Sequence, residues 1–239
     1  MPITKESFRF IAELWEHNNK KWFDKNRERY IEHVREPIKQ LAGELAVPVS
    51  MLLPDFTGKP KISKINADIR FHPKKKPYKE HIWVSYKETG YEYSELFVYI
   101  DRKGWGAGAG IGAPKKELLE CWRQNLIQHI SLWRKYVKAA GVGKKIGVFS
   151  ESKFKKPLYP DIPEDVLDIV QAKSVWIVEN ENKKKTKPTE GDLFNSICRM
   201  FPVYLFMTSS PKDLPYNLKN MLKSIHPPDD IYKIWKAVS

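Results

Sequence analysis

The spacing of apolar residues along the chain predicts helices near its start. Between residues 5 and 17, apolar side chains recur three or four positions apart, which is typical of an amphipathic helix. A second helix is expected from about Lys21, with an apolar face that runs to Leu45. Pro37 should kink or restart this helix, because proline lacks a backbone N–H donor. Residues 48–60, with three prolines and a glycine, are expected to form a loop.

Residues 64–71 follow a different pattern, in which apolar and polar positions alternate. Alternation places successive side chains on opposite faces of a strand, so the stretch predicts a strand with one apolar face and one charged face. The polar positions are Lys64, Asn66, Asp68 and Arg70. Further strands are expected at 82–87, 94–101 and 174–178.

Glycine occupies every second position from Gly104 to Gly112. On a strand these glycines all face the same side, which leaves the backbone there open to a ring, a helix or a ligand. The spacing partly matches a dinucleotide-binding fingerprint. However, the run does not open a βαβ unit, and the sequence lacks the acidic partner of the ribose at the required distance. A closely packed strand is therefore the better interpretation.

Helical spacing returns from Pro114 to Ala140, and residues 180–239 also predict helices. This order predicts an α+β protein with a central, mainly antiparallel sheet, a meander, flanked by N-terminal and C-terminal helices. We expect one domain over residues 1–239, and it divides by element type. It is helical over 1–60, sheet-forming over 61–113 and helix-rich over 114–239.

The formal net charge of +13 is concentrated in two segments. Residues 59–87 contain nine Lys or Arg and two acidic residues, and residues 134–156 contain eight and one. If these basic segments converge in space, they would attract phosphates, nucleic acid or an anionic surface. If they are independent, they are solvated loops that keep the protein soluble.

Several classes of protein and site are disfavoured. The longest apolar run, residues 201–207, is far shorter than a membrane span, and the N-terminus lacks the apolar stretch of a signal peptide. Cys121 and Cys198 are far apart and each falls in an expected helix, which favours reduced thiols in a cytoplasmic protein. The six histidines show no zinc-binding spacing, and no nucleophile elbow occurs, so we expect no cofactor.

The charged face of residues 64–71 and its continuation supply the candidate site. Arg70 would offer a guanidinium fork to a phosphate or carboxylate, and Lys79 would add a second positive charge. Tyr78 would orient the ligand as a neutral donor, and Asp68 would fix Arg70 or act as a base. We expect Asp68 and Arg70 to be largely buried beside a pocket that Lys79 reaches. Alternatively, the Asp68–Arg70 pair only braces the sheet.

Three blocks of sequence carry a family resemblance: HNNKKWFDKNRERY at 17–30, ISKINADIRFHPKKKPYKEHI at 62–82 and GWGAGAGIGAP at 104–114. They resemble family 2461 of the domains of unknown function, which is found in bacteria and fungi. The family pattern includes the candidate ligand-binding residues Asn66, Asp68, Arg70, Tyr78 and Lys79. It also includes Asn18, Asn19, Trp22, Phe23, Arg27 and Tyr30. The family has no established activity, so the resemblance supplies a motif and no reaction.

Three functions are consistent with these patterns. The first is binding of an anionic small molecule at the charged strand face, with catalysis and oligomeric state left open. The second is nucleic-acid binding through residues 59–87 and 134–156, with aromatic side chains such as Tyr78 and Trp83 available for stacking. The third is a structural or protein-interaction module without a ligand.

Overall fold

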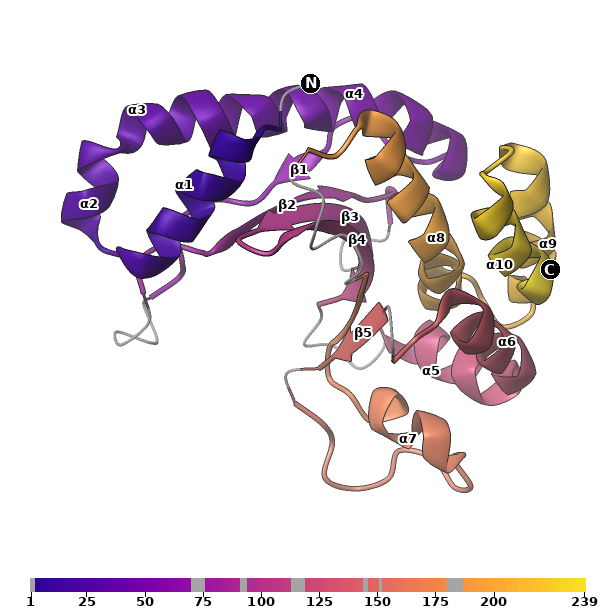
Figure 1. Ribbon diagram of the computed structural model, residues 1–239. Coiled ribbons are helices and arrows are strands. Elements are labelled where there is room, and N and C mark those ends of the chain that lie inside the picture. The colour runs from indigo at the N-terminus through magenta and orange to yellow at the C-terminus, as the bar shows by residue number, and fades with distance from the viewer. Residues whose placement is uncertain are drawn as a thin grey trace.

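The computed structural model shows a curved antiparallel sheet with helices on the outer side of the curve (Figure 1). The residues that it describes are 3–69, 76–90, 94–112, 119–143, 146–150, 152–179 and 187–239. The α+β class expected from the sequence is confirmed. We call the side of the sheet covered by helices the helical face and the opposite, concave side the hollow face.

The N-terminal helices are α1 (Lys5–Glu16), α2 (Lys20–Lys25), α3 (Arg27–Tyr30) and α4 (Glu36–Leu52), with a π-helical turn at Ile31–Arg35. Pro37 lies at the start of α4, directly after the π-helical turn, so the interruption expected there takes the form of a change in helix type. The loop expected from residue 48 is wrong at its start, because α4 continues through Pro48 to its end. Val49 and Leu52 are buried, and their burial offsets the hydrogen bond lost at Pro48.

Six strands form the sheet, in the order β1-β2-β3-β4-β6-β5, and all neighbours are antiparallel. They are β1 (Lys61–Ile62), β2 (His81–Tyr86), β3 (Ser94–Asp101), β4 (Gly104–Ile111), β5 (Ile146–Phe149) and β6 (Val175–Glu179). The meander from β2 to β4 and the strand β6 match the sequence prediction. The sequence pattern does not predict the edge strand β5, because its few residues lie in a lysine-rich stretch whose composition is typical of a loop.

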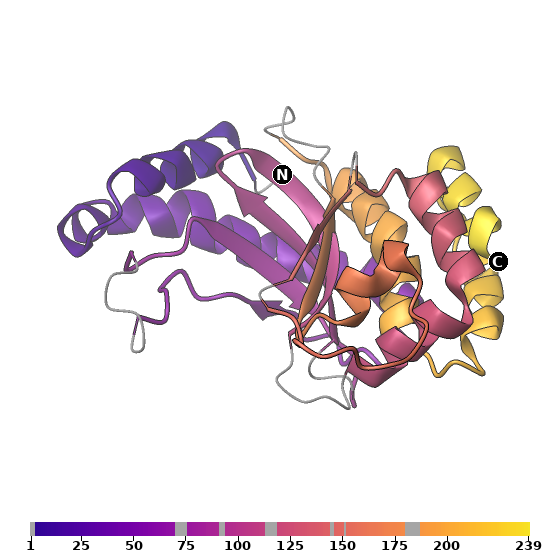
Figure 2. The same ribbon diagram turned by 90° about the horizontal axis from the view of Figure 1, so that it is seen from below.

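The C-terminal half supplies α5 (Glu120–Gln128), α6 (Ile130–Ala140), α7 (Glu164–Val170), α8 (Glu190–Thr208), α9 (Leu214–Ser224) and α10 (Asp229–Val238). Seen from below, α1 to α4 and the C-terminal group gather at opposite ends of the sheet (Figure 2). Within the described ranges, no helix combines the length and apolar character that crossing a bilayer requires.

The two faces of the sheet differ because side chains alternate along each strand. Val84, Val98, Ala107 and Ile177 point from four neighbouring strands to the helical face, where all are buried in the core. The long helix α8 packs there against β3 and β4. An ion pair also joins the sheet to α8: Glu179 at the end of β6 is fully buried and pairs with Arg199 of α8.

On the hollow face, the glycines of β4 lie beneath aromatic rings from the neighbouring strands. Tyr99 of β3 is paired with Gly106, and its hydroxyl crosses β4 to donate to the backbone oxygen of Glu179, 2.8 Å away. Phe97 covers Gly108, and Trp176 of β6 covers Gly110. The glycines therefore face one side, as expected, and what approaches them is a ring.

The strand expected at residues 64–71 does not form over Lys64–Ile69; the rest of that range lies outside the described residues. The described part makes one isolated bridge, between Asn66 and Tyr78. The expected alternation of buried and exposed side chains is found locally, since Ile65 is buried and Asn66 is exposed. It could not extend into a ladder, because the opposing segment contains Pro77, which has no N–H to donate.

A valine at position 108 should destabilise the fold by at least about 1–3 kcal/mol. Its Cβ would meet the ring of Phe97 and lie 2.9 Å from the backbone oxygen of Ile177, so the sheet would have to shift. Gly43→Ala is the control: it lies in α4 with open space around it, and alanine should stabilise that helix by up to about 1 kcal/mol. Urea unfolding of both variants checks this. A Gly108→Val protein that unfolds like the wild type would mean that the rings do not press on β4.

Candidate functional site

The segment around Tyr78 is held on both sides by hydrogen bonds. On one side, Ala67 N donates to Pro77 O at 2.9 Å and Lys79 N donates to Ile65 O at 2.7 Å. On the other side, the side-chain amide of Asn18 takes both backbone groups of Tyr78. Its Nδ2 donates to the carbonyl oxygen at 2.8 Å, and its Oδ1 accepts from the N–H at 3.0 Å. The side chain of Asn18 thus makes the two backbone hydrogen bonds that a neighbouring strand would otherwise make.

The ring of Tyr78 is fixed by a second part of the same sequence block. It stacks on Phe23 of α2 with the ring centroids 4.1 Å apart and is 7% exposed. The adjacent Asn19 caps α2, because its Oδ1 accepts from the N–H of Trp22 at 3.0 Å. Asn18 and Asn19 therefore set the start of α2 and the position of Tyr78 together.

A cavity of about 400 Å³ lies between the helices from α2 to α4 and residues 62–66; we call it the basic groove. Its charged lining residues are all basic: Arg27, Arg35, Lys39 and Lys64. Its polar neutral lining residues are Tyr30, Ser63, Asn66 and Tyr78. Desolvation raises the pKa of Tyr30 and of Tyr78, so both hydroxyls are neutral donors at pH 7. Four apolar side chains complete the lining beside Phe23: Ile38, Ile62, Ile65 and Ile82.

The π-helical turn shapes one wall of the basic groove. Tyr30 and Arg35 are five positions apart in the sequence, which would place them about 140° apart around an α-helix. In the π-helical turn the N–H of Glu36 bonds to Ile31 O, and this wider turn lets Tyr30 and Arg35 line the same cavity. Such turns inside α-helices are frequent at functional sites.

Three of the four cations make ion pairs at the rim. Arg27 contacts Asp24 at 2.6 Å, and Lys39 contacts Glu36 at 2.9 Å, which also lies 3.8 Å from Arg35. These side chains are largely exposed, and exposed pairs contribute little to stability. A ligand anion can therefore replace them at low cost.

The groove brings together only part of the site expected from the sequence. Asn66 and Tyr78 line it. Lys79 does not: it follows Tyr78 on the opposite side, with its Nζ 4.6 Å from the ring centroid of Trp83. There, desolvation and the nearby Lys61 lower the pKa of Lys79. The expectation that Lys79 reaches the same pocket is therefore wrong, because consecutive side chains of an extended segment point to opposite faces.

Asp68 is exposed, so its expected burial beside a pocket is also wrong. Beyond the hydrogen bond from Ala67 N to Pro77 O, residues 68 and 69 belong to no strand. Arg70 lies outside the described residues, and its role stays a prediction.

None of the four groove cations is among the candidate ligand-binding residues expected from the sequence, although Lys64 lies on the charged strand face and the family pattern includes Arg27. Arg27, Arg35 and Lys39 lie in a stretch where acidic residues balance the charge, so a search for excess charge passes over them. A usable signal was present: Arg35 and Lys39 are one helical turn apart and therefore share a face.

A second surface, the hollow face, carries a cavity of about 550 Å³ whose lining is mostly aromatic. The rings are those of Trp83, Phe97, Tyr99, Phe149 and Trp176. The basic segment 59–87 supplies β1 and β2 at one edge of the sheet, and the basic segment 134–156 supplies β5 at the other.

In the part of the chain that is described, no three His, Cys, Asp or Glu side chains gather in a metal-binding group.

Comparison with known proteins gives one match. A family model described as "Conserved hypothetical protein (DUF2461)" matches residues 6–204, which include the basic groove and all six strands. No curated protein and no solved structure matches the chain.

Replacing Asn18 by Asp should destabilise the protein by about 1–3 kcal/mol. The carboxylate still accepts from the N–H of Tyr78, but it cannot donate to the carbonyl oxygen and leaves that group facing a negative charge. Lys20→Ala, an exposed change on α2, is the control. Thermal unfolding and hydrogen exchange at residues 76–79 measure the effect. Wild-type protection at these residues in Asn18→Asp would show that the amide does not hold the segment.

Proposed function

We propose an anion-binding function for this chain, which belongs to the family of conserved hypothetical proteins DUF2461. The family description assigns no reaction, so the proposal rests on geometry. The observation that carries it is the lining of the basic groove: four basic side chains and no carboxylate among the residues described there. A cavity of about 400 Å³ suits a small molecule better than a macromolecule.

The proposed ligand has an anionic group and an apolar body. The guanidinium groups of Arg27 and Arg35 suit a phosphate or carboxylate, because each offers a planar fork of donors. Lys39 and Lys64 add positive charge, and Tyr78 adds a neutral hydroxyl. The isoleucines of the groove would cover the apolar part of the ligand.

The proposal is for binding and leaves catalysis open. The described lining of the groove includes no carboxylate, histidine or cysteine that would act as a base or nucleophile. Arg70 follows the groove segment in sequence, and we keep it as a further candidate ligand-binding residue. We also propose a cytoplasmic location, which the free thiols of Cys121 and Cys198 support.

A thermal-shift screen with phosphorylated and carboxylated metabolites tests this function. A ligand at a hundredfold excess over its Kd should stabilise the protein by about 2.7 kcal/mol. Arg35→Lys keeps the charge and loses the fork, so it should respond less, and Lys64→Ala should respond less through lost charge. Both positions are exposed, so the fold should survive. Arg70→Lys, screened alongside, reports whether residue 70 contributes.

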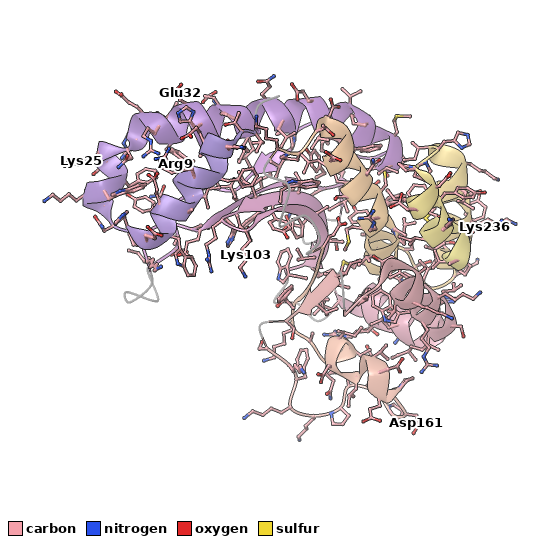
Figure 3. All side chains as sticks on the ribbon, in the orientation of Figure 1. Arg9, Lys25, Glu32, Lys103, Asp161 and Lys236 are labelled. Carbon is pink, nitrogen blue, oxygen red and sulfur yellow. The ribbon has the colours of Figure 1, made fainter. Side chains whose placement is uncertain are left out.

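Lys25→Ala is the matched control, because Lys25 lies at the outer end of α2 and does not line the groove (Figure 3). It should respond like the wild type. The proposal fails if no anion stabilises the wild type, or if Arg35→Lys and Lys64→Ala respond as fully as Lys25→Ala.

Nucleic-acid binding is the second candidate function. One observation favours it: the two basic segments supply opposite edges of a single sheet, with the aromatic hollow face between them. A polyanion lying across that face would approach both segments. Between the two edges the described surface is lined mostly by rings, so the sheet itself would have to contribute contacts.

Binding through lysines must weaken steeply as salt rises, because neutralised phosphates release their counterions. We expect micromolar or tighter binding of mixed-sequence oligonucleotides at low salt, measured by fluorescence anisotropy over a salt series. Arg35→Lys serves as the control, since the basic groove takes no part in this mode. The second function is lost if no oligonucleotide, single-stranded or duplex, binds at low salt.

A further inference from the structure

The hollow face presents aromatic rings from four of the six strands. Trp83 comes from β2, Tyr99 from β3, Trp176 from β6 and Phe149 from β5. Phe149 is 53% exposed, and the other three are partly exposed. Apolar side chains exposed together as one patch often mark an interaction site.

The glycine strand gives this surface its shape. Because β4 has no side chains on the hollow face, the rings of Tyr99 and Trp176 reach over its backbone from either side. The cavity of about 550 Å³ opens above them. Among the described elements, the helices lie on the outer side of the curve, and the hollow side is left uncovered (Figure 1).

Cations lie beside the rings. Lys79 sits 4.6 Å from the ring centroid of Trp83, and Lys61 is close enough to lower its pKa. Lys103 lines an adjoining cavity of about 230 Å³ together with Tyr99 and Phe149, and it points to the hollow side (Figure 3). These ammonium groups can meet phosphates while the rings meet bases.

The acidic side chains of the hollow face are already engaged. Glu95 is buried and pairs with Lys87 at 3.3 Å. Asp101 accepts from the backbone N–H groups of Lys103 and Gly104 at 2.6 and 3.0 Å. His81 stacks on Trp83, and desolvation together with Lys79 lowers its pKa, so it presents a neutral ring at pH 7.

We propose that the hollow face binds single-stranded nucleic acid by stacking bases on Trp83, Tyr99, Trp176 and Phe149. The proposal rests on the second candidate function and names its contact surface and its substrate class. Stacking requires unpaired bases, because a duplex keeps their faces covered. The strand would run across the sheet from the β2 edge to the β5 edge, with its phosphates near Lys61, Lys79 and Lys103.

The test uses labelled single-stranded DNA, single-stranded RNA and duplex DNA with the full chain, in anisotropy titrations over a salt series. Both single strands should bind more tightly than the duplex. Phe149→Ala should weaken single-strand binding about tenfold at every salt concentration. Tyr216→Ala is the control, since Tyr216 is an aromatic residue of α9 that is 69% exposed and does not line the hollow face.

A pair of lysine variants separates stacking from charge. Lys103→Ala should reduce the slope of log affinity against log salt by about 0.7 if it meets one phosphate. Lys236→Ala, on α10 away from the hollow face (Figure 3), should leave that slope unchanged. Phe149→Ala should lower affinity with the slope intact, which a loss of charge contact would not do.

The outcomes distinguish the two ideas. Tighter binding of single strands with losses in Phe149→Ala and not in Tyr216→Ala supports the stacking surface. Equal binding of duplex and single strands, unaffected by Phe149→Ala and by Trp83→Ala, overturns the stacking surface and leaves a charge-driven nucleic-acid function. Absence of binding to every oligonucleotide removes the nucleic-acid function itself, while the anion screen on the basic groove is unaffected.

Discussion

The architecture depends on the absence of side chains along one face of the central strand β4. Gly106, Gly108 and Gly110 allow rings from both neighbouring strands to lie on the backbone, where any Cβ would collide with them. The other face of the same strand carries Trp105, Ala107, Ala109 and Ile111, all buried against helices. One strand therefore separates a thick, helix-covered side from a thin, ring-lined side.

The two candidate surfaces lie on opposite sides of one short segment. Tyr78 points to the basic groove between the segment and α2, whereas Lys79 points to Trp83 on the hollow face. The amide of Asn18 fixes the backbone between them. The two candidate surfaces therefore share one backbone anchor.

Local patterns predicted the fold better than they predicted the site. The glycine run identified a strand because its periodicity is contained in nine residues, 104–112, and needs no distant partner. The stretch 64–71 has equal periodicity, but a ladder also needs a partner with free N–H groups, which Pro77 cannot supply. The groove cations Arg27, Arg35 and Lys39 come from helices that meet residues 62–66 only in the folded chain, so charge counts along the sequence could not select them.

The short edge strands have a consequence for the behaviour of the protein at high concentration. A sheet edge presents unpaired N–H and C=O groups, to which another copy can add a strand. Here β1 has two residues and β5 has four, and both lie in the segments that hold the excess positive charge. Two copies that approach edge to edge offer each other little ladder to extend and bring like charges together. The shortness of both edge strands thus limits the growth of the sheet from copy to copy, whichever ligand the protein binds.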